Sequence, residues 1–307
     1  MGEQEDGGCA ESAALKVWRR QSVWSQSADA VKATIQRARA AGLALGICAA
    51  VGGAASAQTM GASPTAGKVL AFAAALAAGC APLAAQWAAA DRVRDWTRLR
   101  SVSEALKSEL YRRLAGAGPY RTDTADAVLL DRTAALEEDA GDLVRHTVGI
   151  ASAERALPQV RDTATYAELR LRRQITDYYR PRALLMRRRL ATARRVEVSL
   201  GAAAAVLAAA GGALGVAATG AWTAVVTTVA VAVVAHAAAA KYDYQELEFS
   251  RTAMELERLV ERWERGAVAN VGGGGDDRGQ ADSDFVQRCE DVISIQNEAW
   301  MVKWQAE

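Results

Sequence analysis

A long uncharged block in the second half of the chain predicts a helical hairpin. No Asp, Glu, Lys or Arg interrupts the sequence between Val198 and Ala240, and about 20 mostly apolar residues suffice for one membrane-spanning helix. The stretch 219–222 combines a helix-breaking glycine with a tryptophan, a residue that favours the membrane interface. We therefore expect spans near 198–218 and 221–240. The alternative is a pair of buried helices in a large soluble core, which rarely run this far without a charge.

The first half of the chain shows the same pattern. Residues 42–57 and 69–90 carry no charge, and a polar turn with one proline separates them at 58–65. This predicts spans near 41–58 and 69–90, with a kink at Pro82 of the kind that membrane helices tolerate. The predicted fold is an all-α integral membrane protein with two transmembrane helical hairpins, four spans in all, and long cytoplasmic helical extensions.

Charges flanking the spans predict their orientation. Between them, the two turns carry only Lys68, whereas basic residues gather outside the hairpins, at Lys32, Arg37, Arg39, Arg92, Arg94, Arg98, Arg100, Arg187, Arg188, Arg189, Arg194, Arg195 and Lys241. Cytoplasmic loops are enriched in Lys and Arg. We therefore expect a multi-pass protein of the cell membrane whose termini and central region are cytoplasmic, with residues 58–67 and 219–222 facing outward.

Residues 89–117 align without a gap on residues 239–267, which predicts two copies of one unit. In the later copy Phe249, Ala253, Leu256, Val260 and Trp263 follow spacings of 4, 3, 4 and 3, a helical stripe of coiled-coil type. The stripe is interpreted either as packing within the chain or as a contact between subunits. Each later span is expected to continue into a cytoplasmic helix.

The predicted divisions are a disordered tail (1–12), a divergent first two-span repeat (13–117), a cytoplasmic insertion (118–160), and a second two-span repeat with a C-terminal helix (161–307). The formal net charge is only +1 over 307 residues. This balance excludes a globally basic nucleic-acid binder, so no nucleic-acid partner is expected.

A strongly basic helical segment, 160–195, precedes the second hairpin, with Tyr166, Leu169, Ile175 and Tyr179 as its expected buried side. Its candidate lipid or nucleotide contacts are Arg187, Arg188, Arg189, Arg194 and Arg195. Arginines next to a span typically contact anionic lipid, which is the simpler interpretation.

Few polar side chains lie inside the predicted spans. Thr223 and Thr227 stack on one helix face and are candidate pore-lining residues, together with Gln86 near the cytoplasmic mouth. His236 is the candidate intramembrane ionisable group, or a residue that reaches the interface close to Lys241. Threonine hydroxyls also commonly bond the carbonyl one turn earlier, which would require no pore.

No catalytic or metal-binding pattern is present. HExxH, P-loop and GxSxG motifs are missing, and the four cysteines show no CxxC spacing. The glycine run 272–275 lacks the strand and the lysine of a phosphate-binding loop, so it is interpreted as a flexible linker. We expect no enzymatic activity, no cofactor and no metal site.

Several stretches resemble the SLATT family, the SMODS- and SLOG-associating two-transmembrane effector domains. They are Arg173-Gln174-Ile175, the run 177–183, the following hairpin, the charged helix to Trp263, and a closing helix with Phe285, Val286, Glu290, Ile293, Glu298 and Trp300. The resemblance covers about 158–304, and the first half is similar to a divergent copy. A Gly-rich loop at 266–284 and Pro181 depart from the pattern.

The resemblance implies a membrane effector of bacterial conflict systems. Such an effector would assemble into a homo-oligomer that forms a pore or disrupts the membrane. Nucleotide second messengers or nucleotide-sensing proteins are then expected as partners, besides the lipid bilayer. The family has no catalytic motif to transfer. The alternative function is a non-conducting membrane-anchored scaffold or sensor whose cytoplasmic helices bind a partner.

Overall fold

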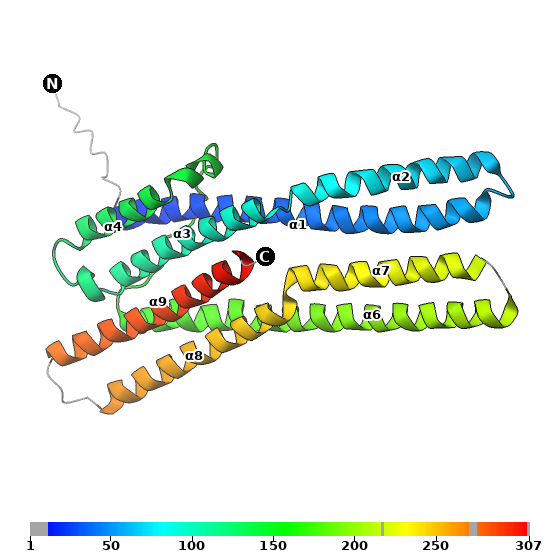
Figure 1. The fold of residues 1–307 in the computed structure, drawn as a ribbon. Helices are drawn as coiled ribbons and strands as arrows, with labels where there is room; N and C mark the ends of the chain where they lie inside the picture. The colour runs from blue at the N-terminus through cyan, green and yellow to red at the C-terminus, as the bar shows by residue number, and fades with distance from the viewer. Residues whose placement is uncertain (1–11, 216–217, 270–274, 306–307) are drawn as a thin grey trace, which may run out of the picture. The chain divides into compact units, whose positions relative to one another are not determined.

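The computed structural model describes residues 12–215, 218–269 and 275–305. These residues form helices and no strand, which confirms the all-α prediction. The long helices are α1 (Ala13–Thr59), α2 (Pro64–Gln86), α3 (Ala90–Leu114), α6 (Arg180–Leu214), α7 (Ala218–Ala240), α8 (Tyr242–Ala269) and α9 (Gly275–Gln305) (Figure 1). The shorter elements are η1 (Gly118–Tyr120), α4 (Ala125–Asp139), η2 (Gly141–His146), α5 (Thr163–Tyr166), and the π-helical η3 (Ala167–Arg172) and η4 (Ile175–Tyr179). The expected tail 1–12 lies, except for Ser12, outside the described residues.

The chain divides into two compact units. The hairpin unit comprises Lys32–Val93 and Arg180–Ser250, and the bundle unit comprises Met1–Val31, Arg94–Tyr179 and Arg251–Glu307. The hairpin unit contains the four predicted spans, and the bundle unit contains most of the charged segments. The proposed division into two two-span repeats concerns the relation between the halves of the sequence, and it stays a prediction.

In the first hairpin, α1 and α2 are held together near their turn. Ser56 Oγ donates a hydrogen bond to the Gly67 carbonyl at 2.7 Å. A Cβ at Gly52 would lie 3.2 Å from Ala74 Cβ, so a glycine permits this close approach. By contrast, a Cβ at Gly42 or Gly46 would meet nothing within 4 Å. Gly42 and Gly46 are separated by four positions, a spacing that allows close helix packing, but they bring no helices together among the described residues.

The second hairpin turns earlier than the sequence suggests. Helix α6 ends at Leu214, and Gly215 adopts a φ of 64° while its N–H donates to the Gly211 carbonyl at 3.0 Å. A glycine in this left-handed conformation is a common helix terminator. Residues 219–222, which were expected to form the turn, instead lie at the start of α7, so that prediction was wrong by about one helical turn.

The later span of each hairpin is interrupted where it leaves the hairpin. Helix α2 continues through Pro82 to Gln86, and α3 begins at Ala90; α7 ends at Ala240, and α8 begins at Tyr242. The two interruptions lie within two residues of one another in the alignment of 89–117 on 239–267. Each later span nevertheless runs on into a charged helix, α3 or α8, after a break of only a few residues, as the sequence led us to expect.

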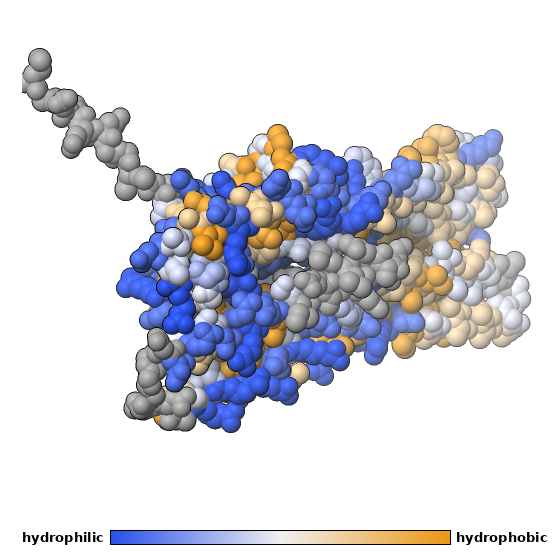
Figure 2. Space-filling model, turned by 60° about the vertical axis from the view of Figure 1, so that its left-hand side comes forward, coloured by the Kyte–Doolittle hydropathy of each residue, from blue (hydrophilic) through white to orange (hydrophobic). Residues whose placement is uncertain are grey.

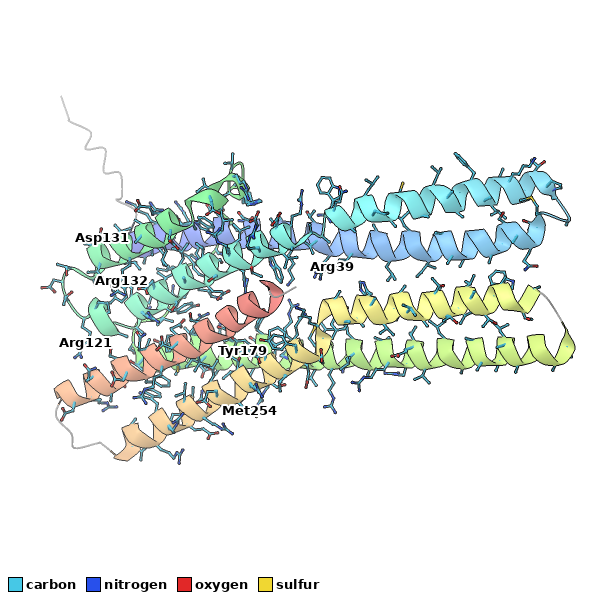
Figure 3. The ribbon with its side chains drawn as sticks, viewed as in Figure 1. Arg39, Arg121, Asp131, Arg132, Tyr179 and Met254 are labelled. Atoms are coloured by element: carbon cyan, nitrogen blue, oxygen red, sulfur yellow. The ribbon has the colours of Figure 1, made fainter. Side chains whose placement is uncertain are left out.

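The joint between α7 and α8 is fixed by three hydrogen bonds. Lys241 N–H donates to Ala238 O at 3.0 Å, and the Gln245 side-chain amide donates to Ala240 O at 2.7 Å. A guanidinium N–H of Arg39, labelled in Figure 3, donates to Ala239 O at 3.2 Å. The last carbonyls of a helix lack partners within it, and these donors replace them. Lys241 itself has a φ of 50°, a conformation that costs a non-glycine residue roughly 1–2 kcal/mol.

The core of the bundle unit is built from the faces that the sequence pattern indicated. Leu99, Leu106 and Leu110 are buried, as are Ala253, Leu256 and Val260 of the predicted stripe. The stripe on α8 is therefore covered by its own chain. Leu129 and Leu143 are also fully buried, so the insertion at 118–160 contributes to the same core through α4 and η2.

The connection between α8 and α9 is shorter than expected. The sequence suggested a Gly-rich loop over 266–284, but α8 continues to Ala269 and α9 begins at Gly275. That expectation was wrong because the polar residues after Gly275 form the exposed side of an amphipathic helix whose other side buries Phe285 and Val286. The linker expected at 272–275 lies, apart from Gly275, outside the described residues.

Candidate functional site

Hardly any residue of the four spans is fully buried in the part of the chain that the structure describes. In each of the four helices long and apolar enough to cross a membrane, at most 6% of the most apolar 18-residue window is buried inside the structure. Figure 2 shows hydrophobic residues over the hairpin unit and hydrophilic ones over the bundle unit. Large exposed apolar surfaces mark membrane or protein contacts. The hairpin unit is therefore a membrane-spanning unit.

The predicted polar residues of the spans bond mainly to their own helix. The hydroxyls of Thr223, Thr227 and Thr228 donate to the carbonyls four residues earlier, at 2.9, 2.9 and 2.8 Å. His236 is half-buried in α7, and Gln86 is exposed as the last residue of α2. These bonds satisfy the hydroxyl hydrogens without a water-filled path, so a pore-lining role stays a prediction.

The five candidate arginines lie along α6 before its uncharged stretch. All of them are exposed. Arg189 lies 5.9 Å from the centre of the Tyr242 ring, and Arg195 Nε donates to the Ala191 carbonyl at 3.3 Å. Their exposure leaves them accessible to anionic headgroups, and contact with lipid or nucleotide stays a prediction.

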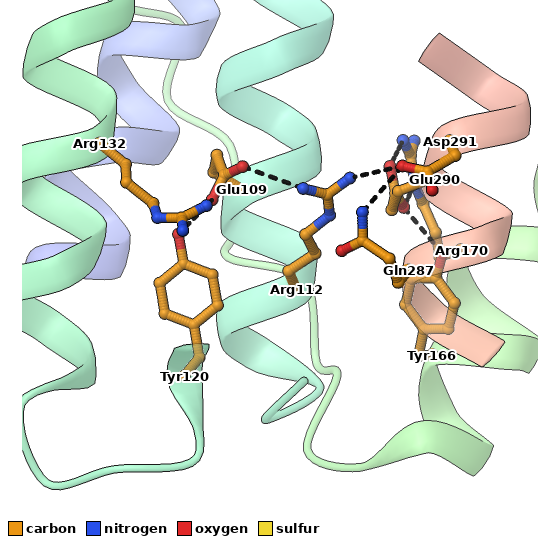
Figure 4. Close-up of polar contacts among 9 residues, drawn as sticks. All are labelled: Glu109, Arg112, Tyr120, Arg132, Tyr166, Arg170, Gln287, Glu290 and Asp291. Carbon is orange, nitrogen blue, oxygen red and sulfur yellow. Dashed lines mark hydrogen bonds and ion pairs between the residues drawn. The ribbon is translucent and has the colours of Figure 1, made fainter. Parts of the chain in front are cut away.

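A buried ion pair in the bundle unit is the most developed polar site of the described residues. Arg170 donates from Nε to Glu290 Oε1 and from Nη2 to Glu290 Oε2, both at 3.0 Å, and Tyr166 OH donates to Glu290 Oε1 at 2.8 Å (Figure 4). The side chains of Arg170 and Glu290 are 2% and 0% exposed. We call Tyr166, Arg170 and Glu290 the clasp, because they join the π-helical segment to α9.

Local structure positions the clasp. Asp162 caps the start of α5, the helix that contains Tyr166. The Asp162 Oδ1 accepts the Thr165 N–H at 2.7 Å, and the Asp162 N–H donates to Thr165 Oγ1. The helix then widens into π-helical turns at 167–172 and 175–179. Such turns are rare and frequently occur at functional sites. The segment leads directly into α6, so the clasp is close in sequence to a membrane span.

The positive charge of Arg170 in the clasp is stabilised by Glu290 and by two further neighbours. Burial alone would lower the pKa of Arg170, but the adjacent Glu290 carboxylate outweighs it and raises that pKa above its ordinary range. Arg170 also donates to Gln174 Oε1 at 2.7 Å and lies 4.5 Å from the centre of the Tyr111 ring. Burial raises the pKa of Tyr166, so its hydroxyl keeps the proton that it donates to Glu290.

A second buried carboxylate lies on α3. Glu104 Oε1 is 2.7 Å from Arg100, and its Oε2 is 3.9 Å from Lys107. Burial would raise the pKa of Glu104, but the charges of Lys107, Arg100 and Arg170 outweigh it and lower that pKa to about 2. Burial lowers the pKa of Lys107 to about 8, against the attraction of Glu104. These charges therefore form one coupled group.

A third group connects α3, α4 and α9. Glu109 accepts a hydrogen bond from Tyr120 OH and one from Arg112 at 3.1 Å, while Arg132 lies 3.7 Å away (Figure 4). Arg112 also reaches Asp291 at 3.2 Å. These helices of the bundle unit are thus connected through ion pairs and charged hydrogen bonds.

A polar cavity of about 150 Å³ lies among these groups. Its lining includes Glu104, Ser108, Arg112 and Glu290. Ser108 Oγ and Arg112 Nε are buried without a hydrogen-bond partner among the described residues, and a cavity of this size has room for bridging water. Its carboxylates are already paired, which suits a structural role better than catalysis. No cluster of metal-ligating side chains occurs in the described part of the chain.

Part of this site was evident from the sequence. Tyr166, Ile175 and Tyr179 are buried as expected, and Leu169 is half-buried. The role of Arg170 was missed, although it lies four residues after Tyr166 and therefore on the same helix face. A charged residue inside an apolar helix face was the available signal, because such residues are rarely buried without a partner.

Two family models match the chain. Residues 166–300 match SMODS and SLOG-associating 2TM effector domain 1, and residues 22–127 match a family described as protein of unknown function (DUF4231). The first match includes both sides of the clasp and the second hairpin, and it confirms the resemblance predicted over about 158–304. No curated protein and no solved structure matches the chain.

Proposed function

We propose that this chain, whose residues 166–300 match the SLATT family of two-transmembrane effector domains, is a membrane effector of a bacterial conflict system that acts as an oligomeric pore. Its partners would be the lipid bilayer, further copies of itself, and a nucleotide second messenger or a nucleotide-sensing protein. The termini and the central region would be cytoplasmic. The family is one of effector domains and is not a known enzyme family.

The observation that supports a pore best is the exposure of the spans. In the described part of the chain, the four apolar helices have at most 6% of the residues of their most apolar windows fully buried, so exposed apolar surface is left for lipid or for other copies. In membranes, close packing of small residues drives helix association. A Cβ added at Gly42 or Gly46 on α1 would have no neighbour within 4 Å, so this face can accept a helix from another copy.

The test is solute flux through liposomes that contain the purified full-length protein. A substitution of Thr223 and Thr227 together by Val keeps the side-chain shape and removes both hydroxyls, so a pore lined by this face should lose conductance or become harder to wet. Thr228→Val is the matched control, because its hydroxyl makes the same bond but points about 100° away around the helix. Equal flux in all three proteins would remove this face as the lining.

The same liposomes test the alternative, a non-conducting membrane-anchored scaffold or sensor. The bonds from the three threonine hydroxyls to their own helix favour this alternative, because they leave no hydroxyl hydrogen that requires water. A protein that inserts, folds and assembles but passes no solute of any size would contradict the pore and support the scaffold.

Orientation is tested by labelling from outside the cell with a membrane-impermeant thiol reagent, in a background without native cysteines. We expect labelling of Ser63→Cys in the turn after α1 and none of Asp131→Cys on α4. Both positions are exposed, so accessibility within the protein does not separate them. Outside labelling at position 131 would contradict the proposed topology.

A further inference from the structure

A second cavity, of about 210 Å³, lies between α8 and α9 within the bundle unit. Its lining combines two aromatic rings, Trp263 and Phe285, with three arginines, Arg262, Arg278 and Arg288. The cavity shares no lining residue with the clasp or with the polar cavity described above. A largely apolar pocket with a few convergent charged groups is the usual form of a small-molecule site.

The aromatic part of the cavity is held in place. The rings of Trp263 and Phe285 stack with centroids 5.0 Å apart and planes 14° from parallel. Trp263 Nε1 donates to Asp282 Oδ1 at 2.7 Å, and the opposite helix therefore fixes the indole. Such fixed ring pairs bind planar ligands at little cost in conformational entropy.

The charged part of the cavity has an excess of positive charge. The three arginines face a single lining carboxylate, Asp282, which already accepts the bond from Trp263. Arg262 pairs with Glu255 at 3.2 Å. Arg278 and Arg288 are exposed and form no ion pair or hydrogen bond with any residue that the structure describes. Arginine is the side chain best suited to phosphate, because its planar guanidinium donates two parallel hydrogen bonds.

We propose that this cavity binds a small phosphorylated ligand with a planar ring, which is the chemistry of a nucleotide. Arg278 and Arg288 would bind the phosphate, and the ring would lie against Trp263 and Phe285. A lipid headgroup or free phosphate offers the anion without the ring, and a nucleoside offers the ring without the anion. The ligand that satisfies both parts of the lining carries both groups.

The cavity also contacts the clasp. Phe285 packs edge-on against the Tyr166 ring at 6.4 Å, and the Tyr166 hydroxyl donates to Glu290. A ligand bound against the Trp263–Phe285 pair would therefore stabilise the packing of α9 on the segment that leads into α6. Control of a pore by this ligand rests on the proposed function, whereas binding does not.

The test is calorimetric titration of the full-length protein in detergent micelles with AMP, adenosine, ribose 5-phosphate and inorganic phosphate. We expect AMP to bind most tightly, and its affinity to fall as salt concentration rises. Replacing both Arg278 and Arg288 by Gln should weaken AMP binding by about tenfold or more and leave adenosine binding nearly unchanged. The matched control replaces Arg258 and Arg265, exposed arginines of α8 outside the cavity, by Gln.

A ring variant tests the other half of the site. Trp263→Leu should weaken binding of AMP and of adenosine by at least about fivefold, the range found for loss of a stacked base. Thermal unfolding of each variant separates a lost site from a lost fold, and the exposed arginine pair keeps the test decisive if Trp263→Leu unfolds. If AMP binds no tighter than phosphate, or if both arginine pairs weaken it equally, the proposal is wrong.

Flux separates binding from control of a pore. Binding of AMP to wild-type protein in liposomes that show no flux would support the site and contradict the pore. Flux without any AMP binding would support the pore and contradict the site.

Discussion

Glu290→Gln provides the most direct test of the clasp. The substitution keeps the size of the side chain and removes its charge, so Arg170 is left as a buried cation that is only 2% exposed. Two charged hydrogen bonds at 3.0 Å are lost or weakened. Removal of one partner from a buried ion pair typically costs about 3–5 kcal/mol, because the remaining charge keeps its desolvation penalty without compensation.

Hydrogen exchange measures this cost where it arises. Amides of α9 and of residues 163–179 exchange when this part of the bundle unit opens, so a loss of about 3–5 kcal/mol should speed their exchange by roughly two to three and a half orders of magnitude. Peptides from α6 and α7 should be affected much less. The measurement uses the full-length protein in detergent, with exchange followed by mass spectrometry.

The neighbouring residue provides the control. Asp291→Asn removes a carboxylate that is 48% exposed and pairs with Arg112 at 3.2 Å, and exposed pairs contribute only about 0–1 kcal/mol. In Asp291→Asn, the exchange rates of the amides of α9 and of residues 163–179 should therefore stay within about fivefold of wild type. If Glu290→Gln and Asp291→Asn speed exchange equally, the clasp does not hold α9, and the reasoning from burial fails.

Three further predictions concern stability. The free energy of unfolding of the bundle unit should fall by up to about 3 kcal/mol as pH falls from 4.5 toward 2. The reason is that the pKa of Glu104 is lowered to about 2 in the folded state, so the unfolded chain binds this proton more readily. Denaturant unfolding across this pH range should show a smaller fall for Glu104→Gln. Gly52→Val should disrupt the first hairpin, where a Cβ would lie 3.2 Å from Ala74, whereas Gly53→Val should not, because a Cβ added there would meet nothing within 4 Å; cross-linking of cysteines placed across α1 and α2 distinguishes them. Asp162→Ala should cost about 1 kcal/mol and speed amide exchange at residues 163–166 alone, since it removes a helix cap.

The spans could be predicted because they depend on local composition. A stretch without charge long enough to cross a bilayer must form a helix there, since only helices satisfy the backbone of such a segment within lipid. The uncharged run 198–240 therefore determined the second hairpin, and the runs 42–57 and 69–90 determined the first. The helical stripe from Phe249 to Val260 likewise identified the buried face of α8, because the spacing of apolar residues reflects helix periodicity.

Features that depend on one conformation at one residue were less accessible. The second hairpin turns at Gly215, although the more conspicuous signal lay at 219–222, because several glycines could each have adopted the left-handed conformation that ends α6. The break at Lys241 was unexpected for a similar reason. A lysine rarely adopts a φ of 50°, and hydrogen bonds from Arg39 and Gln245 hold the adjoining end of α7.

The sequence by itself determined the four spans and the helical class, which follow from periodicity and charge. Short motifs in the second half indicated the family whose model matches residues 166–300. Only the tertiary structure decided which charged residues act together. Arg170 and Glu290 are separated by 120 positions along the chain, and no local pattern specifies which acid meets which base. That choice is made when α9 packs against the π-helical segment, because a charge can be buried there only where its partner is already in place.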